Sequence, residues 1–429
     1  MSQPRTPPSP LPKPAEVVLY DFRPPAHKRE AIPQDRPVKI VQWNIERGYK
    51  LDAIIAELRE LDADVLALQE IDIHCERSGW VDTGRAIAEA LGLAYAFVCE
   101  FEELHSPLRS PDSQGGGVHG NAILSKYDIT NARAVEHRTH PVDWELPPER
   151  QPHALARKEP RRGRRLTAAA ELATHQGPLL VYSAHLECFC GALGRMAQVS
   201  DLFRDTREWE EQQRRQRALA AAPVSAAAEP SPEPPSDAAA ASPPAEPMVP
   251  PAEPMAAAAP PLPAALLGDL NTLGNGVARL SPHYCTDHLR WASLGWFEAE
   301  LLEKRVLAVT GAQGWASLGW FEAELLEKRV LAVTDPAPLN SWALRQGLSE
   351  AVCRDLVNPG YADPFNSRTD ITFDHYKYRW LGHRLMTGKF DWALLRGCRV
   401  VGRRLGNHDY AASDHKWLEV EVHLRPAAA

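Results

Sequence analysis

Segments with strand character in this chain repeatedly end in a polar residue that local packing does not require. The strand-like run 38–43 is followed by Asn44, and the nearly continuous apolar run 63–68 leads to Glu70. The same pattern recurs in five later segments, 119–125, 182–187, 267–272, 390–395 and 413–416. Buried carboxylates and imidazoles are costly unless they are paired or bind a cation. We therefore expect these strand ends to converge on one site.

The first elements of the chain have the order strand, helix, strand. Apolar residues between the first two strands follow i, i+3, i+4, i+7 spacing, which predicts a helix over 51–61. A second helix is expected over 83–91, with Thr83 as N-cap and Gly92 as the stop. The remaining predicted elements are strands at 94–100, 119–125, 165–173 and 178–186 and a charged helix at 193–217. This order indicates an α/β protein.

Proline is concentrated in two segments of the 429-residue chain. Residues 1–35 are expected to form a flexible Pro-rich tail with a short extended piece at 17–20. The segment 218–264 contains 14 Pro and 18 Ala, and it has too few aromatic and branched residues to form a core. We interpret it as a disordered insertion in a surface loop of one domain, 36–426. The alternative is a linker between two domains.

An internal duplication interrupts the C-terminal half. Residues 291–310 recur without a change at 315–334, so a 24-residue unit is repeated within 291–334. Each copy predicts an amphipathic helix capped by Ser293 or Ser317. Two copies are too few for a solenoid, and we expect one copy to be structurally redundant. A two-helix binding platform is the alternative.

The net charge of −8 argues against binding nucleic acid by bulk electrostatics. The basic run 157–165 is either a guide for a polyanion or a solvated loop, and the loop is favoured because no aromatic residues are interleaved. Seven scattered Cys indicate reduced thiols. No apolar run is long enough to span a membrane, and the N-terminus lacks the apolar core of a secretory signal. We therefore expect a cytoplasmic or nuclear protein that is not secreted and has no transmembrane segment.

Seven sequence blocks together resemble the endonuclease/exonuclease/phosphatase superfamily, which includes deoxyribonuclease I. They occur in the order of that family, as WNIERG, ALQEID, HGNAILS, SAHLE, LGDLNT, FDWALL and SDHKW. The resemblance implies an α/β (α+β) fold, a four-layer α/β/β/α sandwich in which two mixed β-sheets are flanked by helices. It also implies a Mg²⁺- or Mn²⁺-dependent hydrolase that cleaves a phosphoester by in-line attack of an activated water. Hard carboxylate and amide oxygens suit Mg²⁺.

The resemblance assigns a metal-binding role to three residues. Glu70 matches the principal metal-binding glutamate of the family, and Asn44 either adds an oxygen ligand or orients Glu70. Asp414 would hold the site or a second cation. Glu46 is either a further ligand or part of a solvated loop.

The resemblance also assigns the catalytic residues. Asp269 matches the aspartate that orients or deprotonates the attacking water, and Asn271 matches the amide that steadies the phosphoryl oxygens. His415 matches the histidine that contacts the phosphate, as general acid/base or as a cation, and Asp391 matches its orienting carboxylate. His185 matches a second histidine of the deoxyribonuclease and sphingomyelinase branches.

Asn121 and Glu187 are expected to shape the site, Asn121 by binding substrate; the alternative for both is a structural role. The substrate predicted from these blocks is a nucleic acid or a phospholipid-type phosphodiester, and no obligate protein partner is inferred. A second hypothesis is a catalytically inactive family member that acts as an interaction module through its Ala/Pro-rich insertion.

Overall fold

The computed structural model describes most of the two predicted sheets and their helices. The described residues are 10–25, 32–140, 142–151, 154–221, 260–272, 303, 347–374, 379–380, 383–384 and 387–424. The duplicated segment 291–334 lies outside them, apart from residue 303, and so does most of the Ala/Pro-rich segment 218–264.

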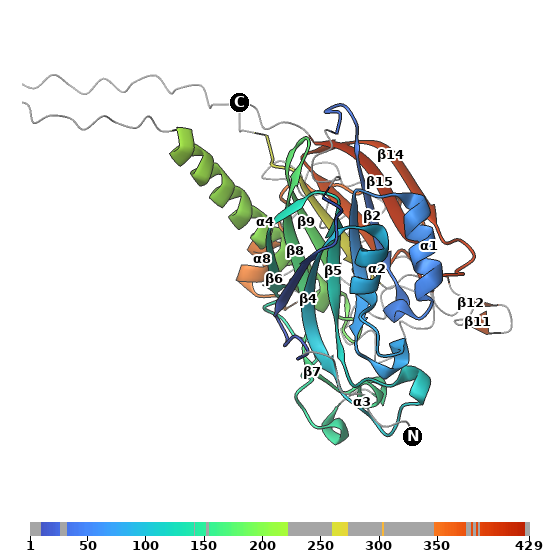
Figure 1. Ribbon diagram of the computed structural model, residues 1–429. Coiled ribbons are helices and arrows are strands. Elements are labelled where there is room, and N and C mark those ends of the chain that lie inside the picture. Colours follow the sequence, from blue (N-terminus) through green and yellow to red (C-terminus); the bar gives the residue numbers. More distant parts are fainter. Residues whose placement is uncertain are drawn as a thin grey trace, which may run out of the picture.

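Eight strands form the larger sheet (Figure 1). Its order is β1 (Val17–Asp21), β4 (Ala94–Glu103), β5 (Val118–Ser125), β3 (Val65–Ile73), β2 (Val38–Asn44), β15 (Trp417–Leu424) and β14 (Cys398–Gly406), and β7 (Arg161–Gly163) also pairs with β4. The neighbours β2 and β3 run parallel, whereas the other pairs are antiparallel. The sheet is therefore mixed.

Five strands form the second sheet. Its order is β13 (Asp391–Arg396), β10 (Ala264–Asp269), β9 (Gly177–His185), β8 (Leu166–Thr174) and β6 (Asp128–Glu136). Only the β9–β10 pair is parallel, so this sheet is also mixed. A separate two-stranded ribbon consists of β11 (Arg379–Trp380) and β12 (His383–Arg384).

Helices cover the outer face of each sheet (Figure 1). The larger sheet carries α1 (Leu51–Leu61) and α2 (Thr83–Leu91), whose apolar residues join one core with β2, β3, β4 and β5. The second sheet carries α4 (Ala192–Ala221) and α8 (Glu350–Asp355), which share another core with β9, β10 and β13. A third core fills the space between the two sheets. The predicted four-layer α/β/β/α sandwich is confirmed.

Side-chain alternation along the strands explains where polar residues collect. In β2, Val38 and Ile40 face the core between the sheets, whereas Val41 and Trp43 face the helices. Since successive side chains point to opposite faces, the next inward position after Ile40 is Gln42, followed by Asn44. In β10, Ala265 and Leu267 point inward, and Asp269 is the next residue of the same parity. The strand ends thus place polar groups between the two sheets.

Most predicted elements are confirmed. The helix over 51–61 has the expected bounds, and the charged helix expected at 193–217 is α4. The helix 83–91 also has the expected bounds and ends at Gly92, but its N-cap is Asp82, whose carboxylate accepts from the Arg85 N–H. Asp82 is the N-cap in place of Thr83 because the backbone of Asp82 is extended, so that its carboxylate can accept from an N–H of the first turn.

The short extended piece expected at 17–20 within the Pro-rich segment 1–35 is a strand, and this part of the segment is paired with the larger sheet. Val17–Asp21 forms β1, which pairs antiparallel with β4 in register from Val17↔Val98 to Asp21↔Ala94. Val18 packs against the helix-facing core and Val17 against the inter-sheet core. This segment therefore covers an edge of the larger sheet.

No helix among the described residues is long and apolar enough to cross a membrane.

Candidate active site

A cavity of about 370 Å³ opens at the strand ends. Seven of the residues singled out in the sequence line it: Glu46, Glu70, His185, Asp269, Asn271, Asp414 and His415. Asn44 and Asp391 lie directly behind this wall and bond to residues in it. The structure therefore brings together, in one cavity, side chains that are far apart in the chain, such as Glu46 and His415.

Asn44, at the end of β2, connects the predicted metal-binding residue Glu70 with the predicted catalytic residue Asp269. Its Nδ2 donates to Glu70 Oε1 at 3.3 Å and to Asp269 Oδ2 at 3.1 Å, while its Oδ1 accepts from the Glu46 backbone N–H at 3.1 Å. A backbone N–H can only donate and a carboxylate can only accept, so the amide orientation is fixed from both ends. Of the two roles considered for Asn44, orienting Glu70 is the one that this geometry favours.

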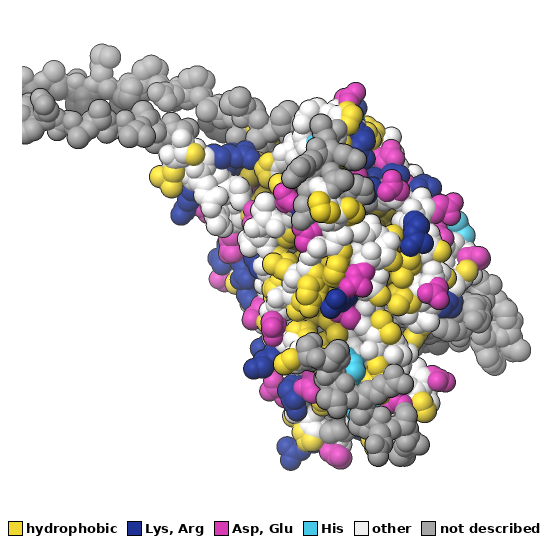
Figure 2. Space-filling view, viewed as in Figure 1, with side chains coloured by type: hydrophobic (Ala, Val, Ile, Leu, Met, Phe, Trp, Pro, Cys, Tyr) yellow, Lys and Arg dark blue, Asp and Glu magenta, His cyan; other side chains and the backbone are white. Residues whose placement is uncertain are grey.

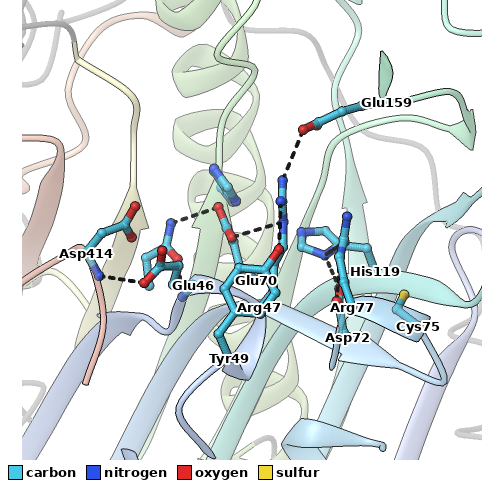
Figure 3. A network of polar contacts seen from close by, with 12 residues as sticks. Glu46, Arg47, Tyr49, Glu70, Asp72, Cys75, Arg77, His119, Glu159 and Asp414 are labelled. Carbon is cyan, nitrogen blue, oxygen red and sulfur yellow. Dashed lines mark hydrogen bonds and ion pairs between the residues drawn. The ribbon is translucent and has the colours of Figure 1, made fainter. Parts of the chain in front are cut away.

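Glu70 reaches the cavity because the strand is irregular there. The β3–β5 register shifts between Leu68 and Ile71, and Glu70 has φ 60°, a left-handed conformation. Arg47 Nε lies 3.6 Å from Glu70 Oε2 (Figure 3). Burial alone would raise the pKa of Glu70, but the field of Arg47, assisted by nearby histidines, holds that pKa below its ordinary value. Glu70 is thus a carboxylate at neutral pH.

Two more carboxylates face the same end of the cavity. Glu46 Oε2 accepts from the Asp414 backbone N–H at 3.1 Å, and Figure 3 shows these two residues beside Glu70. All three carboxylates line the cavity, and their hard oxygen atoms are the ligand type that a divalent cation such as Mg²⁺ prefers. Thiolates do not contribute here, since the nearest lining thiol, Cys188, has a pKa raised by burial to about 12.

Two compact groups of histidine and carboxylate also occur among the described residues. In the group Glu100, His119 and His185, two members contact Arg165, whose Nη1 donates to Glu100 Oε2 at 2.9 Å and to His185 Nδ1 at 3.1 Å. A guanidinium is always charged, so this group is a poor place for a second cation. The other group, Asp269 with Asp391 and His415, is already hydrogen-bonded internally.

Asp269 ends β10 and is almost completely buried. Its Oδ1 accepts from the Asn271 backbone N–H at 2.8 Å, and its Oδ2 lies 3.6 Å from His185 Nε2 and 3.7 Å from His415 Nε2. Burial raises the pKa of Asp269 to about 7, with Asp391 adding to the shift and His415 opposing it. A carboxyl group with this pKa can exchange a proton near neutral pH.

His415 and Asp391 form a buried ion pair. His415 Nδ1 lies 2.8 Å from Asp391 Oδ2, and Phe373 packs against the imidazole at 4.9 Å between ring centroids. Burial opposes the imidazolium, but Asp391 and Asp269 outweigh it and raise the pKa of His415 well above its ordinary value. His415 therefore presents a protonated Nε2 to the cavity.

His185 differs from His415 in charge. Burial, reinforced by Arg165, lowers the pKa of His185 well below its ordinary value. Since Arg165 donates to Nδ1, the proton of the neutral ring resides on Nε2, which faces Asp269. One histidine next to Asp269 is thus neutral and the other is cationic.

A line of buried amides joins the two sheets behind the site. Gln42 Nε2 donates to Gln69 Oε1 at 2.7 Å and to Asp391 Oδ1 at 2.8 Å, and Gln69 Nε2 donates to Ser183 Oγ at 2.8 Å. All four side chains are fully buried. This network fixes the position of Asp391 and, through it, of His415.

Three predicted residues have structural contacts. Asn271 lines the cavity, but its Nδ2 donates to the Leu186 carbonyl at 2.8 Å. Asn121 does not line the cavity; it is fully buried and donates to the Leu166 carbonyl at 3.2 Å, which links the two sheets. Glu187 is buried and accepts from Trp144 Nε1 and the Phe189 N–H at 3.1 Å each. The contacts of Asn121 and Glu187 are thus those of residues with a structural role, which was the alternative considered for both.

The loop interpretation of the basic run 157–165 is wrong for two of its members. Arg161 begins β7, and Arg161 and Arg165 are buried and line the cavity, whereas Arg162 and Arg164 are exposed. Strand alternation turns Arg161 inward and Arg162 outward. On the face shown in Figure 2, basic and acidic side chains are interspersed. Of this basic run, Arg161 and Arg165 therefore place positive charge inside the cavity.

Sequence reasoning missed Arg47 and His119 as cavity residues. His119 Nδ1 lies 2.7 Å from Asp72 Oδ1, in a second histidine–aspartate pair that Arg77 supports with bonds of 2.7 and 2.9 Å to Asp72 (Figure 3). A signal for His119 existed, because it precedes Asn121 by two residues and so shares its inward parity in β5.

Comparison with known proteins places this geometry in context. The model of a family described as Endonuclease/Exonuclease/phosphatase family matches residues 41–415. One similar solved structure is an endonuclease/exonuclease/phosphatase from Beutenbergia cavernae DSM 12333, with 14% identity and a TM-score of 0.42 over 91% of this chain and 72% of that chain. A second is ANGEL2, a 2′,3′-cyclic phosphatase, with 13% identity and a TM-score of 0.43 over 91% of this chain and 96% of that chain. A third is the human Nocturnin catalytic domain, with 14% identity and a TM-score of 0.38 over 95% of this chain and 97% of that chain. No curated protein sequence matches the chain significantly. The family match extends from β2 to His415 and so spans the whole candidate site.

Proposed function

The chain belongs to the Endonuclease/Exonuclease/phosphatase family and is a phosphoester hydrolase, and we propose that it cleaves phosphodiester bonds with Mg²⁺ or Mn²⁺ by in-line attack of an activated water. The observation that carries this proposal is the placement of Asp269. Its carboxyl group lies between a carboxylate-rich end of the cavity and a protonated histidine. The substrate class is a nucleic acid or a phospholipid-type phosphodiester.

Glu70, Glu46 and Asp414 would hold the cation, and Asn44 orients Glu70 toward it. A bound divalent cation supplies positive charge that polarises the phosphoryl oxygen. Glu70 suits this role because its lowered pKa keeps it ionised. Its loose contact with Arg47, at 3.6 Å, leaves the carboxylate oxygen atoms available.

Asp269 accepts the proton of the attacking water. Its pKa of about 7 matches this task, because a general base works best when its pKa is close to the working pH. Asn44 and the Asn271 N–H each donate to its carboxylate, one to each oxygen, which holds the group in position.

His415 stabilises the charge that develops on the phosphoryl group. The Asp391 carboxylate keeps it protonated, and its Nε2 faces the cavity. A preorganised cation in a site with few waters lowers the barrier more than the same charge in water. The neutral His185 contributes a hydrogen-bond donor from the other side of Asp269.

The test is hydrolysis of bis(p-nitrophenyl) phosphate by the purified full chain with and without Mg²⁺. Asp269→Asn should lower kcat by about 10²–10⁴-fold, the usual contribution of a positioned general base. The exposed Asp128, which pairs with Arg23 far from the cavity, provides the matched control Asp128→Asn. Equal activity of native protein and Asp269→Asn would refute the role of Asp269, and absence of Mg²⁺-dependent hydrolysis by the native protein would support instead the inactive interaction module.

We also propose that residues 36–426, completed by β1 from the N-terminal segment, form one catalytic domain. The Ala/Pro-rich segment lies between α4 and β10, yet β10 pairs in parallel with β9 from Ala264↔Leu180 to Asp269↔His185. A linker between two independent domains would not separate neighbouring strands of one sheet. Limited proteolysis within 222–259 should therefore leave the two fragments associated and active.

A further inference from the structure

Glu159, in the turn between α3 (Ala154–Lys158) and β7, faces several arginines at one end of the cavity. Its carboxylate oxygens lie 3.5 Å from Arg47 Nη2, 3.8 Å from Arg109 Nη2 and 3.8 Å from Arg161 Nη2. Figure 3 shows Glu159 above Arg47, on the side away from Asp414. The Glu159 carboxylate thus forms ion pairs with three guanidinium groups, and all three contacts are too long for a good hydrogen bond.

The same arginines have donors with no hydrogen-bond partner among the described residues. These buried atoms are Arg47 Nε, Arg109 Nη2, and Nε and Nη1 of Arg161. The side chain of Arg161 is only 2% exposed and that of Arg109 only 3%. Buried donors of charged groups are normally satisfied, because leaving them unpaired is costly. Arg109 Nη1 does donate to Glu103 Oε2 at 2.9 Å, but the four atoms named above have no acceptor among the described residues.

Arg161 is held rigidly while its hydrogen bonds remain unmade. Its guanidinium carbon lies 3.7 Å from the centroid of the Trp144 ring and 4.2 Å from that of Phe101. Stacking fixes the plane of the guanidinium but supplies no acceptor. Burial, not fully compensated by nearby carboxylates, lowers the pKa of Arg161. The position is preorganised for an anion that brings several acceptor oxygens.

Arg47 connects this cluster to the catalytic end. The same guanidinium contacts Glu70 through Nε and Glu159 through Nη2 (Figure 3). The two ends are therefore one side chain apart. Arg161 also lines an adjoining cavity of about 490 Å³, so there is room for a substrate to extend past the arginines.

We propose that Arg47 and Arg161, which line the cavity, form a binding site for a second phosphate group of the substrate, one that is not hydrolysed, and that Arg109 adds positive charge behind them. This proposal rests on the proposed phosphodiesterase function and names its substrate class: a phosphodiester that also carries a phosphomonoester. The dianionic phosphate takes the acceptor role that Glu159 fills weakly in the free protein. Substrates with only the scissile phosphate bind less tightly.

A binding experiment tests this independently of turnover. Thymidine 3′,5′-bisphosphate and thymidine 5′-monophosphate differ by one phosphate, and their affinities are compared by isothermal titration calorimetry with Ca²⁺, which takes the same oxygen ligands as Mg²⁺. The native chain should bind the bisphosphate at least about tenfold more tightly, the effect of one or two charge-assisted hydrogen bonds. Arg161→Gln should abolish this preference, and Glu159→Gln should increase it.

Arg215→Gln is the matched control, since Arg215 is exposed and pairs with Glu211 on the surface of α4, and it lines neither cavity. It should retain the preference within about twofold, as expected for a surface ion pair. If Arg161→Gln does not fold, as judged by circular dichroism, the comparison of native protein with Glu159→Gln decides. Glu159→Gln leaves the arginines in place and removes only the competing charge.

Equal affinity for the two ligands in the native chain would overturn the proposal, and so would a preference that survives in folded Arg161→Gln or fails to grow in Glu159→Gln. Failure of the proposed function would be seen separately. In that case bis(p-nitrophenyl) phosphate would not be hydrolysed, whereas the preference for the bisphosphate would remain.

Discussion

Replacing Asp269 with Asn removes a buried carboxyl group whose pKa is raised from 3.8 to about 7 in the folded chain. In the native chain, the folded state therefore holds the proton of the Asp269 carboxyl group more tightly than the unfolded state does. The stabilisation is fully present below the unfolded pKa and is lost as the pH rises through the folded pKa. Three pKa units correspond to about 4 kcal/mol over the whole range.

A narrower window isolates this group from its neighbour. Below pH 6.5, His415 stays protonated in the folded chain and is at least half protonated in the unfolded chain, so its raised pKa adds only about 0.4 kcal/mol of pH dependence there. Between pH 5 and pH 6.5, Asp269 alone should lower the free energy of unfolding by about 2 kcal/mol. Asp269→Asn lacks this contribution. Any fixed cost of placing an amide against Asn44 or Asn271 is the same at both pH values and cancels.

Urea unfolding of the two proteins at both pH values, without metal, measures the difference. Other titrating groups, such as Asp82 with its pKa of about 6, are present in both proteins and also cancel. The native chain should lose about 2 kcal/mol more than Asp269→Asn as the pH rises across this window. Parallel behaviour of the two proteins would refute the raised pKa of Asp269 on which the general-base role depends.

Three further predictions address the rest of the site. With Asp269 as the base, kcat/KM for bis(p-nitrophenyl) phosphate should rise about tenfold per pH unit below pH 7 and level off above it; a pH–rate profile that is flat from pH 5 would contradict this. Glu70→Gln should raise the Mg²⁺ concentration for half-maximal activity by about tenfold or more, in a metal titration that leaves the exposed-residue control Glu89→Gln unchanged. Gln42→Leu leaves Asp391 Oδ1 without its donor and should cost about 1–3 kcal/mol in urea unfolding, and unchanged stability would exclude a supporting role for that bond.

The fold was predictable from the sequence because local patterns and the layer architecture agree. The apolar spacing over 51–61 and the nearly continuous apolar β3 each admit one interpretation, a surface helix and a strand covered on both faces. An extended piece at 17–20 was expected, but its place as strand β1 of the larger sheet was not, because its surroundings are rich in Pro and its side chains are half-exposed. Its stability comes from pairing with β4, a long-range contact that no local pattern records.

The catalytic half of the site was predictable, whereas the arginine half was not. Asp269 and His185 end inward-facing runs, so the strand pattern itself marks them as polar groups between the sheets. Arg161 precedes a charged neighbour, Arg162, and the run looks uniformly solvated. Only the pairing of β7 with β4 turns one arginine inward and the other outward. That pairing depends on residues about 60 positions away in the chain.

Strand parity accounts for the inward residues, and its one failure is informative. Gln69 has the inward parity of Val65 and Ala67 and joins the buried amide network, so a regular β3 would turn Glu70 toward the helices. The irregularity between Leu68 and Ile71, with Glu70 at φ 60°, instead brings both residues to the inner side. A left-handed conformation at a non-glycine residue is costly and persists where the surroundings enforce it. The chain therefore accepts backbone strain at the position proposed to hold the cation, where a regular strand would offer no carboxylate.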